Sequence, residues 1–169
     1  PFGAIEVKGV EEMLEMYHNS GQYGHLLPVL IRESGSAYAF FRDLAEWNRA
    51  HGYEVCQPSR MTRFEILLEF AAARHPEKRE MYAELLTFDC WLRERCKKRP
   101  DFCPDLTAYR DRIRETDARP EAHVEVFRYA VWDAGEADPA RLPAPATVVF
   151  MYDRRSPLDN NAAWRLIAD

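Results

Sequence analysis

The stretch SRMTRFEILLEFAAARH, from Ser59 to His75, is the segment that decides the fold of this chain. Ser59 suits the N-cap of a helix, and Pro76, which follows the stretch, cannot continue one. Apolar residues fill one face and spread beyond it, which is typical of a helix buried among other elements. The stretch therefore predicts a central helix of a bundle. Its predicted core residues are Phe64, Ile66, Leu67, Leu68, Phe70, Ala71 and Ala73.

Helical periodicity fills most of the first two-thirds of the chain. The clearest further helix runs from Ser36 to Gly52, because serine suits the N-cap and glycine the position after the helix end. Pro28 predicts that a helix starts close to it or kinks there. The other predicted helices run from Val10 to Tyr17, from Glu77 to about Lys98, and from about Asp105 to Glu115.

The pattern changes after residue 118. The stretches HVEVFRYAVW (123–132) and ATVVFMYD (146–153) are rich in strand-forming residues, and AWRLIA (163–168) favours a third strand. The Pro- and Ala-rich segment 133–145 predicts a mobile loop. We expect an α+β fold, mainly α: a helical bundle of five to six helices followed by a small two- or three-stranded antiparallel sheet. Residues 1–169 form a single domain in this interpretation, with a helical part (1–118) and a small β part (119–169).

Composition narrows the class of protein. The 169 residues carry 47% hydrophobic and 30% charged side chains, the balance of a soluble globular domain. No apolar run approaches the ~20 residues of a membrane helix, and no leader is visible, so we expect a cytoplasmic protein without a membrane partner. The net charge of −5, from 23 basic and 28 acidic residues, makes nucleic acid an unlikely partner, because phosphate binders carry a basic excess.

Three of the four cysteines, Cys90, Cys96 and Cys103, lie in the fourteen-residue stretch CWLRERCKKRPDFC. Their spacings are longer than the C-x2-C and C-x3-C-x2-C patterns of zinc and iron–sulfur sites. On one continuous helix, Cys90 and Cys96 point about 120° apart. The fourth cysteine, Cys56, lies in a loop. We predict reduced free thiols and no metal site.

Asp89 shares the apolar side of the predicted helix with Leu85 and Leu92. A buried carboxylate is costly unless it is paired. The first interpretation is a structural pair with an arginine such as Arg60 or Arg63. The alternative is a substrate contact or a proton-transfer group.

Two further stretches are strongly charged. The residues from Arg93 to Arg99 are mostly basic and follow the predicted helix end, where positive charge complements the helix dipole. A solvated face is the first interpretation and a phosphate-binding patch the second. The sequence YDRR (152–155) allows the same alternatives. Its candidate contact residues are Asp153, Arg154 and Arg155.

The stretch MYHNSGQY (16–23) gathers polar and aromatic groups at a predicted helix end. Helix ends and turns collect such residues, but the same groups suit contact with another domain or a ligand. No nucleophile–base motif, P-loop or dinucleotide fingerprint is present. The candidate contact residues here are Tyr17, His18, Asn19, Gln22 and Tyr23.

Four stretches carry a resemblance to a known family: EVKGVEEMLEMYHNSGQY (6–23), FEILLEF (64–70), LLTFDCWLRER (85–95) and YDRRSPLDNNA (152–162). They resemble the C-terminal domain of unknown function of bacterial radical-SAM proteins that also carry a cobalamin-binding domain. Cys90 departs from the aromatic residue expected after Phe-Asp, so the resemblance assigns the role of Asp89 less securely.

The resemblance implies a radical-SAM barrel domain in the same polypeptide, which is the expected partner. The start at Pro1, without methionine, then corresponds to a cut at a domain boundary. The resemblance also implies an iron–sulfur cluster, S-adenosylmethionine and cobalamin for the parent protein. It implies none of these for this fragment, which lacks C-x3-C-x2-C.

Two hypotheses of function follow. The first is a non-catalytic accessory domain that packs against the catalytic barrel and shapes substrate access or partner binding. The second is a free-standing protein- or RNA-interaction module, for which the basic run from Arg93 to Arg99 is the main support. An autonomous hydrolase or transferase is the weakest interpretation, since no catalytic constellation is present.

Overall fold

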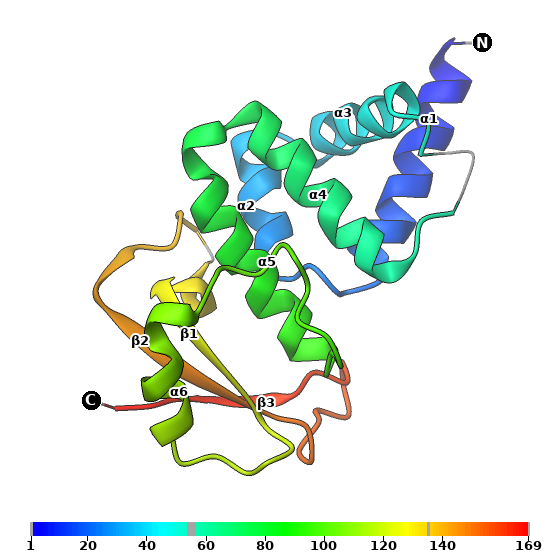
Figure 1. The fold of residues 1–169 in the computed structure, drawn as a ribbon. Coiled ribbons are helices and arrows are strands. Elements are labelled where there is room, and N and C mark those ends of the chain that lie inside the picture. Colours follow the sequence, from blue (N-terminus) through cyan, green and yellow to red (C-terminus); the bar gives the residue numbers. More distant parts are fainter. Residues whose placement is uncertain (1, 54–56, 135, 169) are drawn as a thin grey trace.

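The computed structural model describes residues 2–53, 57–134 and 136–168. Within these ranges it contains six α-helices and a three-stranded antiparallel sheet, so the predicted α+β, mainly α fold is confirmed. Figure 1 shows helices α1 to α4 on one side of the molecule and the sheet with α6 on the other. Helix α5 lies between them.

The six helices follow one another along the described part of the chain before the first strand. Their bounds are α1 (Phe2–Met13), α2 (Leu26–Glu33), α3 (Ala37–Ala50), α4 (Arg60–Arg74), α5 (Arg79–Arg93) and α6 (Arg110–Glu115). A π-helix continues α1 (Leu14–Asn19), and 3₁₀ turns precede α5 (Pro76–Lys78), precede α6 (Thr107–Tyr109) and follow the first strand (Val131–Asp133).

The predicted helix starts are confirmed where a serine supplies the cap. The Ser36 hydroxyl accepts from the Ala39 N–H at 3.1 Å, and the Ser59 hydroxyl accepts from the Thr62 N–H at 3.2 Å. Each bond satisfies one of the donors that a helix start leaves open. Pro28 lies in the first turn of α2, where its missing N–H costs nothing.

Two predicted helix bounds are wrong. The first helix begins at Phe2 and not near Val10. The long helix α5 ends at Arg93 and not near Lys98, because Glu94 adopts an extended conformation (φ −113°, ψ 123°). The basic run therefore lies mostly beyond the helix, and the helix-dipole argument applies only to Arg93.

Helix α5 is the most buried element of the fold. Eleven of its 15 residues are buried, against seven of 15 in α4, which the sequence had marked as central. Helix α4 packs on α5, and α1 packs closely on α3, where a Cβ at Gly9 would lie 3.1 Å from that of Ala45. The aromatic ring of Phe88 on α5 contacts rings from all three strands, namely Phe127, Phe150 and Trp164.

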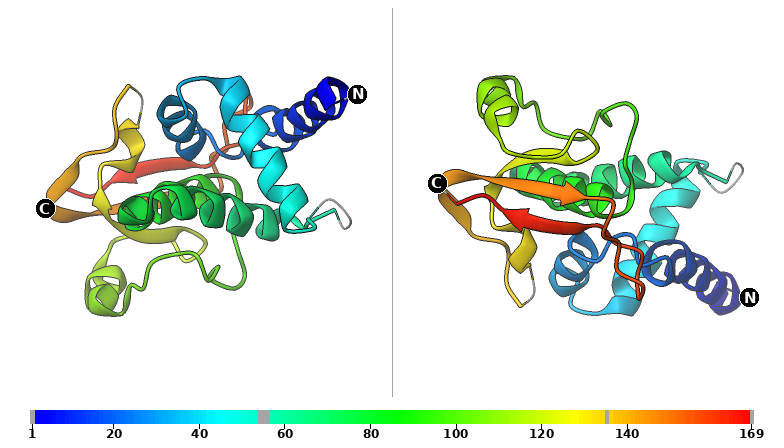
Figure 2. Two further views of the ribbon diagram at one scale, coloured as in Figure 1. Left: turned by 90° about the horizontal axis from the view of Figure 1, so that it is seen from above. Right: turned by 90° about the horizontal axis from the view of Figure 1, so that it is seen from below.

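The sheet has the order β1 (His123–Tyr129), β2 (Arg141–Met151) and β3 (Ala163–Leu166), so the predicted third strand is confirmed. Figure 2 shows α5 across one face of this sheet. Strand β2 begins within the segment 133–145 that the sequence predicted as a loop, because Arg141 pairs with Tyr129. A bulge between Phe127 and Tyr129 shifts the register there.

None of the helices in the described residues combines the length and apolar character needed to cross a membrane.

Candidate functional site

The C-terminal end of α5 is held by donors from the connection between β2 and β3. The Tyr152 hydroxyl donates to the carbonyl of Trp91 at 2.6 Å, and the Ala162 N–H donates to that of Leu92 at 2.7 Å. Arg155 Nη1 donates to the carbonyl of Arg93 at 3.2 Å. The last carbonyls of a helix need such partners. These bonds fix the segment 152–162 to α5 and explain why the helix ends there.

Within that segment, a tight turn presents one apolar side chain. The Ser156 N–H donates to the Asn161 carbonyl at 2.8 Å, and the Asn160 N–H donates to the Ser156 carbonyl at 2.9 Å. Asn160 has a φ of 60°, a left-handed conformation that asparagine tolerates. Leu158, at the tip, is 96% exposed. We refer to residues 156–161 as the Leu158 turn.

Arg93 joins the Leu158 turn to the segment that follows the π-helix. Its Nη1 donates to the Ser20 carbonyl at 3.1 Å, and its Nη2 donates to the Gly21 carbonyl at 3.4 Å. Its Nε donates to Asn161 Oδ1 at 3.3 Å. Gly21 has a φ of +68°, which suits glycine. One side chain thus fixes two segments about 140 positions apart in sequence.

A recess of about 430 Å³ opens beside this junction. Tyr17 and Tyr23 are buried at its base, with ring centroids 5.2 Å apart. Within the described residues, neither hydroxyl has a hydrogen-bond partner, nor does Arg63 Nε. Burial raises the pKa of both tyrosines, so both stay protonated donors. The lining residues are Tyr17, His18, Gly21, Tyr23, Gly24, Leu27, Pro28, Ile31 and Arg32.

Asp89 is buried and paired as the structural interpretation predicts, but the expected arginine partner is wrong. Its carboxylate accepts from the N–H groups of His25 (3.0 Å) and Leu26 (2.9 Å) and from His25 Nδ1 (2.8 Å). It therefore caps the start of α2. Arg60 pairs instead with Glu94.

A histidine–carboxylate pair of this kind can orient a general base. In the described part of the chain, however, no hydroxyl or thiol is hydrogen-bonded to His25.

The other predicted contact residues fall into two groups. His18 lines the recess together with Tyr17 and Tyr23, and its Nδ1 lies 3.2 Å from Asn19 Oδ1. Asn19 and Gln22 lie outside the recess lining, and the Gln22 N–H donates to the Ser20 hydroxyl at 3.4 Å. Asp153 does not take part in the contacts at the end of α5. Its Oδ2 accepts a hydrogen bond from Arg119 at 2.9 Å. The side chain of Arg154 is exposed to solvent. Within the YDRR group, Tyr152 and Arg155 both hydrogen-bond to carbonyls at the end of α5.

The prediction that Cys90 and Cys96 point apart is wrong. Because α5 ends at Arg93, the chain turns back and brings the two sulfurs within 3.8 Å. Cys103 is partly buried nearby, and Cys56 lies outside the described residues. Across the ranges that the structure describes, no group of three or more His, Cys, Asp or Glu side chains could hold a metal ion.

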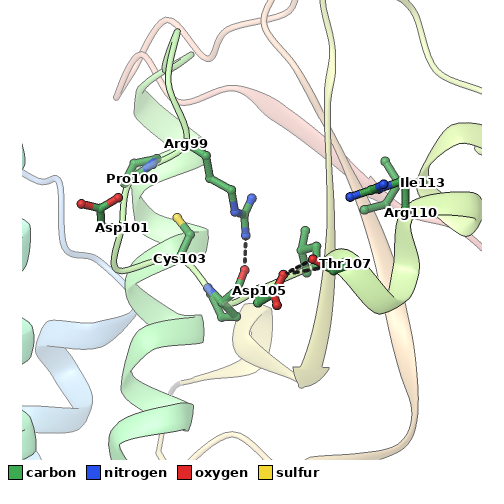
Figure 3. A pocket seen from close by; sticks show the side chains of 10 residues that line it. Arg99, Pro100, Asp101, Cys103, Asp105, Thr107, Arg110 and Ile113 are labelled. Carbon is green, nitrogen blue, oxygen red and sulfur yellow. Dashed lines mark hydrogen bonds between the residues drawn. The ribbon is translucent and has the colours of Figure 1, made fainter.

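The basic run does not form a uniform positive patch. Arg99 turns inward, with both terminal nitrogens at the buried Glu125 and Nη2 also donating to the Pro104 carbonyl at 2.7 Å. Figure 3 shows Arg99 in a shallow hollow of about 490 Å³ together with Asp101 and Asp105, and Arg110 on the far side. Mixed charge here weakens the phosphate-binding alternative.

Sequence reasoning missed two buried carboxylates, although their positions carried a signal. Glu84 lies three residues after Met81 and four before Phe88, on the buried side of α5, and Glu125 lies two residues before Phe127 on its strand face. Glu84 Oε1 accepts from the N–H groups of Arg128 (2.7 Å) and Tyr129 at the bulge. Burial raises the pKa of Glu84 to about 7. Each carboxylate ties α5 or its following loop to β1.

Comparison with known proteins gives one family. A family model described as "Protein of unknown function (DUF4080)" matches residues 3–131, from α1 through β1 into the 3₁₀ turn that follows. Neither the curated proteins nor the solved structures contain a match to this chain.

Proposed function

The chain belongs to the DUF4080 family of proteins of unknown function, and from that premise we propose that it is a non-catalytic accessory domain that binds a catalytic domain of the same polypeptide. The proposed partner is the barrel of a cytoplasmic, bacterial, cobalamin-binding radical-SAM enzyme, the class that the four sequence stretches resemble. By covering the barrel, the domain shapes substrate access.

The observation that carries the proposal is the junction at Arg93. A single exposed leucine on a protein surface needs no explanation. Here, however, Leu158 projects from a turn that Arg93 fixes to Gly21, and Gly21 lines the apolar recess. A projecting side chain beside a recess, both held in place before binding, is a favourable surface for a partner because little order is lost on association.

The lining of the recess favours an apolar ligand. Leu27, Pro28 and Ile31 line it together with Tyr17 and Tyr23, whose hydroxyls are buried. We therefore propose that the partner inserts an apolar segment into the recess.

The implied cofactors do not fit on this part of the molecule. An iron–sulfur cluster needs at least three thiolate ligands, and no such group exists in the described residues. The iron–sulfur cluster, S-adenosylmethionine and cobalamin therefore belong, in this proposal, to the other domains of the parent protein.

The test is association of two separately produced pieces, this chain and the barrel domain encoded with it. Each piece is first shown to be folded by circular dichroism, and binding is then measured by titration calorimetry. Leu158→Asp should weaken binding at least about tenfold, or about 1.4 kcal/mol. Leu166→Asp, at a leucine that is 44% exposed on β3, is the matched control and should bind normally. Two folded pieces that do not associate, or a Leu158→Asp variant that binds normally, would count against the proposal.

The second candidate is a free-standing interaction module for protein or RNA. The exposed side chains of Arg95, Lys97 and Lys98 favour it. If this segment binds RNA, the affinity must fall steeply as the salt concentration rises. Absence of RNA binding at low salt would exclude an RNA-binding module. Sequencing the DNA upstream of the Pro1 codon separates the candidates: an in-frame C-x3-C-x2-C supports the accessory domain, and an immediate start codon supports the module.

A further inference from the structure

The thiols of Cys90 and Cys96 form a close pair with unequal surroundings. Their sulfurs lie 3.8 Å apart. Cys90 is fully buried on the last turn of α5, whereas Cys96 is partly exposed on the irregular segment that follows the helix. One sulfur is therefore held in the core, while the other lies on a segment outside regular secondary structure and is partly exposed.

We infer that Cys90 and Cys96 are a modification site: a dithiol that hydrogen peroxide or an organic hydroperoxide oxidises to a reversible disulfide. A disulfide requires the two sulfurs to close from 3.8 Å to about 2.05 Å. Side-chain rotation at Cys96, with a small shift of its irregular segment, supplies this movement while α5 stays intact. The inference does not depend on the proposed function.

The hydrogen bond between the two thiols assigns their roles. Either thiol can donate in this contact, and the contact raises the pKa of Cys90 and lowers the pKa of Cys96. Burial also raises the pKa of Cys90. Since the thiolate is the nucleophile, Cys96 is the sulfur that meets the peroxide, and Cys90 is the sulfur that resolves the product.

The reaction proceeds in two balanced steps. First, the Cys96 thiolate attacks one peroxide oxygen. The S–O bond forms, the O–O bond breaks, hydroxide or alkoxide leaves, and the attacked oxygen becomes a sulfenic acid. Second, the Cys90 sulfur attacks the Cys96 sulfur. The S–S bond forms, the S–O bond breaks, and water leaves with the Cys90 proton. Two sulfurs lose one electron each, and the two peroxide oxygens gain them.

Cys103 provides an internal control. It is partly buried close to the pair, but burial raises its pKa to about 12, so it remains a slow thiol. It also lies beyond Pro100, on the loop that leads to α6. A reaction that depends on the arrangement of Cys90 and Cys96 should leave Cys103 reduced.

Peptide mapping of the whole chain tests the inference. Trypsin places Cys90, Cys96 and Cys103 on separate peptides, because it cleaves after Arg93, Arg95 and Lys98. The folded chain is treated with equimolar hydrogen peroxide, free thiols are alkylated, and the digest is analysed by mass spectrometry. We expect a Cys90–Cys96 linked peptide that dithiothreitol removes. Before oxidation, iodoacetamide should label Cys96 at least about tenfold faster than Cys90 or Cys103.

Two variants complete the test. Cys96→Ser, in the partly exposed segment, should abolish the linked peptide and accumulate no disulfide to Cys103, whereas Cys103→Ser should leave the link unchanged. A link that forms equally fast in urea-unfolded chain would overturn the inference, because it would owe nothing to the fold. So would a link that joins Cys103 in place of Cys90, or a peroxide treatment that leaves the pair reduced in folded protein.

Discussion

Replacing Asp89 by asparagine is the sharpest test of how α2 is attached to α5. The carboxylate is 2% exposed and accepts three N–H groups, two from the backbone of residues 25 and 26 and one from His25 Nδ1. Asparagine keeps one oxygen and turns an NH₂ group toward at least one of these donors. One or two donors are then left without an acceptor inside the protein.

The magnitude follows from the cost of unpaired buried groups. Each costs about 1–3 kcal/mol, so Asp89→Asn should lower the free energy of unfolding by about 3 kcal/mol. For a chain of this size, that loss lowers the melting temperature by roughly 6–12 °C. The assay is urea unfolding followed by far-UV circular dichroism. The matched control is Asp111→Asn, since the Asp111 side chain is 78% exposed and its loss should cost less than about 0.5 kcal/mol.

His25→Ala separates the contributions of side chain and backbone. It removes the 2.8 Å bond from Nδ1 but leaves both backbone N–H donors, so it should cost about 1 kcal/mol. If Asp89→Asn unfolds at the urea concentration of the wild type, the capping argument is wrong. The burial of Asp89 would then have a reason other than stability, and this result would favour the alternative that Asp89 contacts a substrate.

Three further changes test other contacts. Glu84 has a pKa raised to about 7, above the ~4.3 of an unfolded glutamate, so the folded chain binds the extra proton. Its contribution to stability is present at low pH and is lost as pH rises through about 7. Between about pH 5 and pH 8, urea titrations of Glu84→Gln should therefore show a smaller loss of stability than those of the wild type. Parallel curves of unfolding free energy against pH for the two proteins would contradict this. Gly21→Ala should cost about 1–2 kcal/mol because φ is +68°, whereas Gly24→Ala, with open space around its Cβ, should cost less than about 0.5 kcal/mol in the same titrations. Arg93→Ala should cost about 1–2 kcal/mol by leaving carbonyls unpaired, and exposed Arg95→Ala should be neutral by calorimetric melting; equal effects would show that the Arg93 junction adds no stability.

Local signals in the sequence predict much of this fold. Ser36 and Ser59 mark helix starts because their hydroxyls cap the first turn, a relation that spans three residues. The alternation in residues 123–129 and the β-rich run before Met151 likewise mark β1 and most of β2. Such elements are encoded by neighbours in the chain, so a single sequence suffices to place them.

The end of α5 is encoded differently. Its carbonyls are taken by Tyr152, Arg155 and Ala162, which lie about 60 to 70 positions later, and no local pattern near Arg93 announces them. The error in the helix end then produced the error about Cys90 and Cys96. The burial of Asp89 was visible in its helical position, but its partner comes from a turn 64 residues earlier.

The ring of Phe88 has a consequence for where this protein can be divided. It contacts Phe127 on one side of the family match boundary at residue 131, and Phe150 and Trp164 on the other. A fragment that stops at residue 131 would keep one of these three aromatic neighbours and lose every strand beside β1. We therefore expect that a folded fragment of this chain must extend beyond the segment that the family model matches, through Leu166 at the end of β3.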